Sequence, residues 1–208
     1  MALILSLLRH AQHERGPGVL CGRLAGIGLS SAGVGQARSL ASRFGREPVD
    51  ALYTSPAERC RQTADIIGEA CGLTPAVLDA AAEVDFGEWS GKAFSALDAD
   101  PKWRAWNGSR AEAQAPGGEA MRDVSHRVVL LMEKLRSGHG AGSILLVSHA
   151  EIIRTTILLT LGLPLQAYER IEIDLASISV VSLQEGGGRV LGLNDVGHLA
   201  AIRSVEVA

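Results

Sequence analysis

The chain has 208 residues and a formal net charge of -3, from 20 Lys and Arg against 23 Asp and Glu. Apolar residues make up 47% of it and charged residues 21%, a balance that excludes a disordered chain. A slightly acidic chain also lacks the basic excess that a nucleic-acid backbone or an anionic membrane requires, so we expect neither partner. Cys21, Cys60 and Cys71 are an odd number without CxxC spacing, which favours a reducing, cytoplasmic location and no disulfide framework.

Strand and helix patterns alternate along the chain. Continuous apolar runs predict buried strands, and apolar residues three and four positions apart predict helices. The predicted elements are, in chain order, a strand over residues 2–8, a glycine-rich loop over 16–28, a helix from 31, a strand over 49–53, a helix from 55 to about 72, a strand over 77–78, a helix over 119–136, a strand over 144–147, a helix over 151–161, and an antiparallel hairpin of strands 171–184 and 189–193.

The helix after the second strand carries the clearest start signal. Ser55 matches an N-cap, Pro56 the first helical position and Glu58 the last member of a capping box. Gly72 marks the expected end of that helix.

These patterns predict a three-layer α/β/α fold with a mostly parallel central sheet, one antiparallel strand and an insertion over the site. Residues 1–208 are expected to form a single α/β domain, in which residues 76–118 are an insertion or cap region. All three tryptophans fall in this irregular stretch, so we expect it to pack over the sheet.

Polar residues follow three of the predicted strands. Arg9 and His10 follow the first, Arg59 lies one turn into the helix after the second, and His149 follows the strand over 144–147. The carboxyl ends of parallel strands meet at one rim of the sheet, where ligands bind in such folds. Arginine matches phosphate oxygens two at a time, and a neutral imidazole is a nucleophile near pH 7, so this set predicts phosphoryl transfer.

The same reaction needs a proton donor for the leaving oxygen. Glu83, which opens the segment 83–91, is the best candidate, because a partly buried carboxyl has a raised pKa. Asp85 and Glu88 in the same segment are weaker alternatives.

Five segments together resemble the histidine phosphatase superfamily, in its phosphoglycerate mutase-like branch. Leu8-Arg9-His10-Ala11-Gln12 is similar to its RHG signature, and residues 55–64 are similar to its S-x-x-x-R-x-x-Q-T-A block. The remaining blocks are matched by residues 83–91, 116–119 and 147–150. The blocks occur in the family's order and span residues 3 to about 160.

The resemblance implies a role for each matching residue. His10 would become the phosphohistidine, Arg9 and Arg59 would line the phosphate pocket, His149 would contact the phosphoryl group, and Glu83 would act as acid and then base. The implied substrate-binding residues are Gln12, Cys21, Gly22 and Ala150. The family needs no metal, and no other cofactor is expected.

Several departures from the family pattern bear on the reaction. Ala11 stands for the usual glycine, Gly16 for the asparagine of mutases, and Cys21-Gly22 for their Thr-Gly pair. We therefore predict a metal-independent phosphatase that hydrolyses a small phosphomonoester through a phosphohistidine on His10. The alternatives are a phosphoglycerate mutase-type phosphotransferase and a non-catalytic phospho-ligand binding module.

The expected partner is a small phosphorylated metabolite, and a homodimer is left open. His13, His126, His139 and His198 are expected to be solvated or packing residues.

Overall fold

The computed structural model describes residues 2–200, and the ends of the predicted domain, residues 1 and 201–208, lie outside them. A six-stranded sheet runs through the centre of the protein in the order β3-β2-β4-β1-β5-β6. The strands are β1 (Leu3–Arg9), β2 (Ala51–Thr54), β3 (Ala76–Val77), β4 (Gly142–Ser148), β5 (Ile178–Gln184) and β6 (Gly187–Asp195). Strand β5 is antiparallel to both β1 and β6, while β1 to β4 are parallel to one another. The predicted fold class, a mostly parallel sheet with an antiparallel strand, is confirmed.

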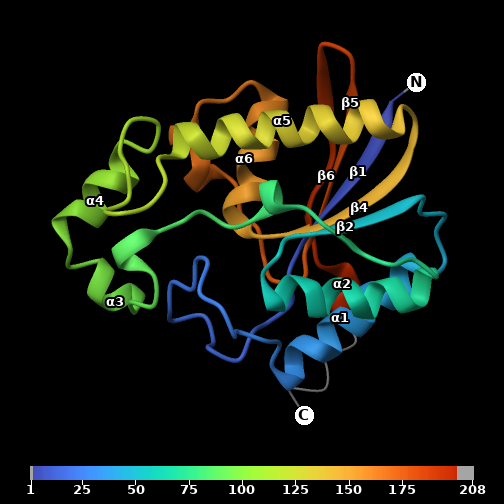
Figure 1. The fold of residues 1–208 in the computed structure, drawn as a ribbon, viewed down its shortest axis with the longest axis horizontal. Helices are drawn as coiled ribbons and strands as arrows, with labels where there is room; N and C mark the ends of the chain where they lie inside the picture. Colours follow the sequence, from blue (N-terminus) through green and yellow to red (C-terminus); the bar gives the residue numbers. More distant parts are fainter. Residues whose placement is uncertain (1, 201–208) are drawn as a thin grey trace.

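Helices cover both faces of this sheet (Figure 1). Helices α1 (Ser31–Phe44) and α2 (Glu58–Cys71) lie on one face, and α5 (Met121–His139) and α6 (Ala150–Leu161) lie on the other. Short 3-10 turns, Leu165–Arg170 and Gly197–Leu199, follow α6 and β6. The central strands β1 and β4 are therefore buried between two helical layers, which explains why they are mostly apolar.

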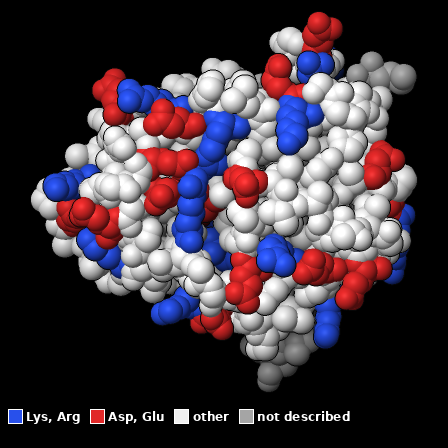
Figure 2. All heavy atoms as spheres, viewed as in Figure 1, with Lys and Arg blue, Asp and Glu red and all other residues white. Residues whose placement is uncertain are grey.

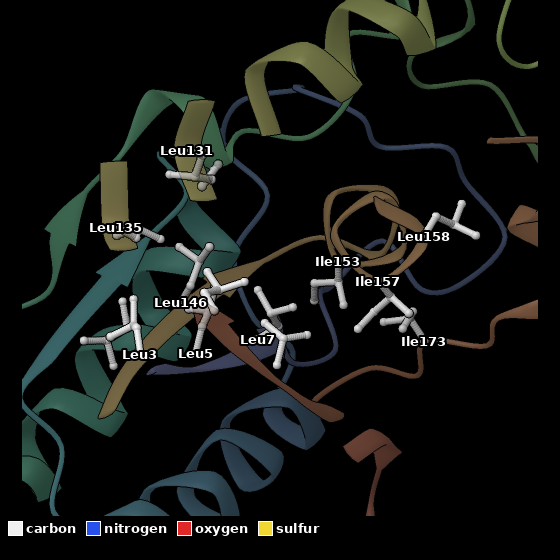
Figure 3. Close-up of a cluster of buried hydrophobic side chains, with 14 of the residues drawn as sticks. Leu3, Leu5, Leu7, Leu131, Leu135, Leu146, Ile153, Ile157, Leu158 and Ile173 are labelled. Atoms are coloured by element: carbon white, nitrogen blue, oxygen red, sulfur yellow. The ribbon is translucent and has the colours of Figure 1, made fainter. Parts of the chain in front are cut away.

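Alternate residues of β1 supply the core on each side of the sheet. Leu3, Leu5 and Leu7 point toward α5 and α6, where they meet Leu131 and Ile153 (Figure 3). Leu8 belongs to the opposite core, under α1 and α2. Burial on both faces fixes the position of β1, and so places the residues at its carboxyl end.

The segment between β3 and α5 forms a separate tryptophan-rich cluster at one end of the sheet (Figure 1). It contains the 3-10 turns Asp79–Ala81 and Gly87–Trp89 and the helices α3 (Phe94–Leu97) and α4 (Pro101–Gly108). The rings of Trp89, Trp103 and Trp106 have centroids 5.2 to 5.8 Å apart. They pack against Met121 and Val124 of α5, so this segment has apolar contacts with the helical layer.

Two predicted elements differ from the structure. Helix α2 begins at Glu58 after Ala57, without a side-chain cap, so the predicted Ser55 N-cap and Pro56 at the first position are wrong. The Ser55 hydroxyl instead lies 2.7 Å from His149 Nε2. The predicted strand from residue 171 begins only at Ile178, although the β5–β6 hairpin itself is confirmed.

The surface carries both signs of charge. Figure 2 shows basic and acidic side chains interspersed over one face of the protein, without a broad basic patch. Within residues 2–200, none of the helices is both long and apolar enough to cross a membrane.

Candidate active site

His10 is the first residue after β1, and its position is fixed by the sheet. Its backbone N–H donates to Ser148 O of the neighbouring strand at 2.9 Å, and its side chain is only 4% exposed. The ring Nδ1 lies 2.9 Å from Ala11 O, while Arg59 Nε donates to the ring Nε2 at 3.2 Å. A carbonyl oxygen only accepts and a guanidinium only donates, so Nδ1 carries the proton and Nε2 carries the lone pair.

The His10 imidazole is held in its neutral form. Burial lowers its pKa well below the usual 6.5, and the positive charges of Arg59 and Arg9 lower it further. A neutral ring with a lone pair on Nε2 is a nucleophile at physiological pH.

Arg59 connects His10 to two other parts of the chain. It comes from the first turn of α2, is 2% exposed, and donates from Nη2 to Gly22 O at 2.8 Å. Gly22 has a φ of +49°, and a Cβ there would lie 3.1 Å from Phe86 and Ser90 side-chain atoms. Glycine is therefore suited to this position, because a side chain would strain the backbone and crowd its neighbours.

Arg9 is the second guanidinium of the site. Its Nη1 donates to Ile173 O at 2.7 Å. Arg9 Nε and Arg59 Nη1 are buried and find no hydrogen-bond partner within residues 2–200. Two arginines that retain unpaired donors are suited to binding an anion with several oxygens.

His149 lies at the start of α6 and is fully buried, with its ring centroid 5.3 Å from that of His10. Its Nδ1 is 3.2 Å from Arg59 Nη2, which only donates, so Nδ1 accepts. Its Nε2 then carries the proton and donates to Ser55 Oγ at 2.7 Å. Burial lowers the pKa of His149 well below its usual value, as does the charge of Arg59.

Among residues 2–200, Glu83 has the only carboxyl group whose pKa is strongly raised. Burial raises its pKa to about 7, and repulsion from Glu151 acts in the same direction. The N–H of Val84 donates to its Oε1 at 2.9 Å, which opposes the rise. Its backbone carbonyl accepts from Arg23 at 2.7 Å and from Arg127 at 3.2 Å, so the start of this segment is anchored.

A cavity of about 570 Å³ joins these groups. Of the residues predicted from the sequence, eight line it: Arg9, His10, Gln12, Cys21, Gly22, Arg59, Glu83 and Ala150. His149 lies buried beside it, next to His10 and Arg59. Within residues 2–200, no group of three or more His, Cys, Asp or Glu side chains is arranged to hold a metal ion.

Four further ionisable residues of the cavity wall were missed from the sequence: His13, Arg110, Glu151 and Asp174. His13, expected to be solvated or packing, is buried with its ring centroid 5.7 Å from that of His10. Glu151 follows His149 by two residues, a proximity that could have indicated it. Asp174 lies inside residues 171–184, which were predicted as strand. It was therefore not among the polar residues that follow a predicted strand.

The family model of the histidine phosphatase superfamily (branch 1) matches residues 5–196. The chain belongs to this superfamily. It is 34% identical over 200 residues to "Phosphoserine phosphatase 1" of Hydrogenobacter thermophilus, covering 94% of this chain and 93% of that protein. The predicted family and enzyme class, a phosphoric monoester hydrolase of the histidine phosphatase type, are confirmed.

Solved structures of related phosphatases have the same fold. A mycobacterial glucosyl-3-phosphoglycerate phosphatase has a TM-score of 0.83 at 26% identity, covering 93% of this chain and 99% of that one. A phosphoserine phosphatase mutant from Entamoeba histolytica, in complex with phosphoserine, has a TM-score of 0.86 at 24% identity, covering 95% and 99%.

Proposed function

We propose that this phosphatase hydrolyses a small phosphomonoester, without a metal, through a phosphohistidine formed on Nε2 of His10. The observation that carries the proposal is the pair of hydrogen bonds that leaves the lone pair on Nε2, beside two arginines. A cavity with Glu83 in its wall adds a group that holds a proton near pH 7.

In the first step, Nε2 of His10 attacks phosphorus and the bond to the ester oxygen breaks. Glu83, in its protonated form, donates its proton to the departing oxygen, and the alcohol leaves. Arg9 and Arg59 balance the negative charge of the equatorial oxygens in the transition state. His149 acts through Arg59, because its Nδ1 accepts from Arg59 Nη2 at 3.2 Å and so holds in place the guanidinium that binds the phosphoryl group.

In the second step, water attacks the phosphorus of the phosphohistidine. Glu83, now a carboxylate, accepts a proton from that water, the P–N bond breaks, and inorganic phosphate leaves. This returns a neutral His10 and a protonated Glu83, so atoms and charges balance over the cycle.

The rest of the cavity would select the substrate. Gln12, Cys21, Gly22 and Ala150 line it, and residues 76–118 act in this proposal as a cap that contributes Phe86, Phe94 and Trp103 to the wall. Within the small phosphorylated metabolites, three-carbon phosphorylated acids are the first candidates, since the relative from Hydrogenobacter is named for phosphoserine. A cytoplasmic location is part of this proposal.

The test is phosphate release from p-nitrophenyl phosphate in excess chelator. The wild-type enzyme should turn over, and His10→Ala should lose at least about 10³-fold in kcat/KM. Turnover retained by His10→Ala would contradict the nucleophile, and activity lost with chelator would contradict the metal-independent mechanism.

The alternatives are separated by the acceptor of the phosphoryl group. A mutase-type phosphotransferase would convert 3-phosphoglycerate to its isomer faster than it releases phosphate. A binding module would bind inorganic phosphate without turning over any ester. Gly16, where mutases carry an asparagine, favours the phosphatase.

A further inference from the structure

Three acidic side chains line the cavity, and they differ in whether an arginine forms an ion pair with them. Glu83 is the proposed acid, and the two oxygens of Glu151 are paired with Arg110 and Arg154. Asp174 forms no ion pair within 4.0 Å with any Lys, Arg or His of residues 2–200, and only the more distant charge of Arg9 acts on it.

Asp174 lies beside the nucleophile. It begins a turn in which Ser177 N–H donates to Asp174 O at 3.1 Å. The same turn contacts the end of β1 twice: Ala176 N–H donates to His10 O at 3.2 Å, and Arg9 N–H donates to Ser177 O at 3.1 Å. The carboxylate is thus presented to the cavity from the backbone that flanks His10.

The Asp174 side chain is held in place by Asn194. Asn194 Nδ2 donates to Asp174 Oδ2 at 3.0 Å, and Asn194 Oδ1 accepts from Asp174 N at 2.6 Å. Asp174 Oδ1 accepts no hydrogen bond from residues 2–200, and the residue lines the cavity. The orientation of the carboxylate is therefore set before any ligand binds.

A carboxylate without a direct ion-pair partner, in a cavity for an anionic phosphate, opposes the binding of a purely anionic ester. It favours a substrate whose own positive group lies near the phosphate, and so discriminates between esters. We propose that Asp174 binds an ammonium group of the substrate, so that the enzyme prefers phosphomonoesters that carry an amine a few bonds from the phosphate. This inference rests on the proposed phosphatase function, and phosphoserine is an ester of this class.

Two natural acids form a matched pair for the test. Phosphoserine and 3-phosphoglycerate share the phosphate, the carboxylate and the three-carbon chain, and differ only in an ammonium or a hydroxyl group on carbon 2. The wild-type enzyme should have the higher kcat/KM for phosphoserine. Asp174→Asn should lower the ratio of the two kcat/KM values at least tenfold, mainly through the KM for phosphoserine. Asp123→Asn, an exposed residue of α5, is the control and should leave the ratio unchanged.

A second variant covers the case in which Asp174→Asn does not fold. Asn194 has a φ of +52°, which glycine adopts readily, so Asn194→Gly removes both side-chain hydrogen bonds to Asp174 without backbone strain. It should also lower the ratio, and an unchanged ratio in this variant would overturn the proposal.

The other outcomes are equally decisive. Equal kcat/KM values for the two acids in the wild-type enzyme would overturn the proposal. So would an equal loss by Asp174→Asn on both acids and on p-nitrophenyl phosphate, because Asp174 would then act through Arg9 on the phosphate itself. If the wild-type enzyme does not turn over p-nitrophenyl phosphate at all, the proposed function fails, and the inference fails with it.

Discussion

Arg59 Nε donates a hydrogen bond to Nε2 of His10 across 3.2 Å, although the two residues are 49 positions apart in the chain. The contact assigns the lone pair of the imidazole to Nε2 and places a positive charge beside it. The same guanidinium donates to Gly22 O at 2.8 Å, so the loop after β1 and the helix after β2 are joined at the nucleophile. In the proposed reaction, a phosphoryl group would take the place of this contact on Nε2 and keep the arginine as its counter-charge.

Replacement of this arginine by lysine should therefore be costly even though the charge is kept. Arg59→Lys removes the fork of donors, and we expect kcat/KM to fall about 10²-fold with p-nitrophenyl phosphate. Arg61→Lys, an exposed residue two positions further along α2, is the control and should retain wild-type kinetics. Wild-type kcat/KM in Arg59→Lys would contradict the assigned role.

The proposed acid and nucleophile predict the pH dependence. Glu83 has a pKa of about 7 and must be protonated to donate, so kcat/KM for alkyl phosphates should fall as the pH rises through about 7. The pKa of His10 lies well below 6.5, so its nucleophilic form, and with it the rate, should persist as the pH falls through 6. A pH–rate profile measured on the wild-type enzyme and on Glu83→Gln checks both limbs.

Substrates with different leaving groups distinguish the role of Glu83 as proton donor from the role of His10 as nucleophile. Glu83→Gln should slow alkyl phosphates more than p-nitrophenyl phosphate, whose leaving group needs no proton, and should remove the limb near pH 7. An equal loss on both substrates would assign the proton to another group.

The sequence predicted the parts of the site that follow strands, and missed those that depend on tertiary packing. Arg9, His10 and His149 follow buried apolar runs, so the topology of a parallel sheet was enough to bring them to one rim. Ser55 was misassigned because the same residue types form an N-cap and a buried hydrogen bond, and only the position of His149 decides between them. Asp174 depends on a turn whose Ala176 has a φ of +55°, a conformation that no local pattern indicates for alanine.

The hydrogen bond between Ser55 and His149 should contribute to stability as well as to catalysis. Ser55→Ala leaves the buried Nε2–H of His149 without an oxygen acceptor, which should lower the free energy of unfolding by about 1–3 kcal/mol. Urea denaturation measures this, with Ser137→Ala in an exposed part of α5 as the control. An unchanged unfolding free energy in Ser55→Ala would show that the hydrogen bond contributes no net stability.

Arg110 should hold the tryptophan-rich segment against α6. Its side chain is 5% exposed and pairs with Glu151, and its guanidinium carbon lies 4.2 Å from the centroid of Trp106 and 3.6 Å from that of Tyr168. Arg110→Ala removes one partner of a nearly buried carboxylate together with both ring contacts, and we expect a loss of about 2–4 kcal/mol in the free energy of unfolding.

An exposed ion pair provides the matched control for this change. Arg122 pairs with Asp123 at 3.7 Å, with both side chains more than 60% exposed, so Arg122→Ala should change the unfolding free energy by less than about 1 kcal/mol. Arg110→Ala should also raise the KM for phosphorylated substrates, because Arg110 and Glu151 both line the cavity. Equal stability losses in the two variants would mean that the Arg110 contacts do not hold the segment in place.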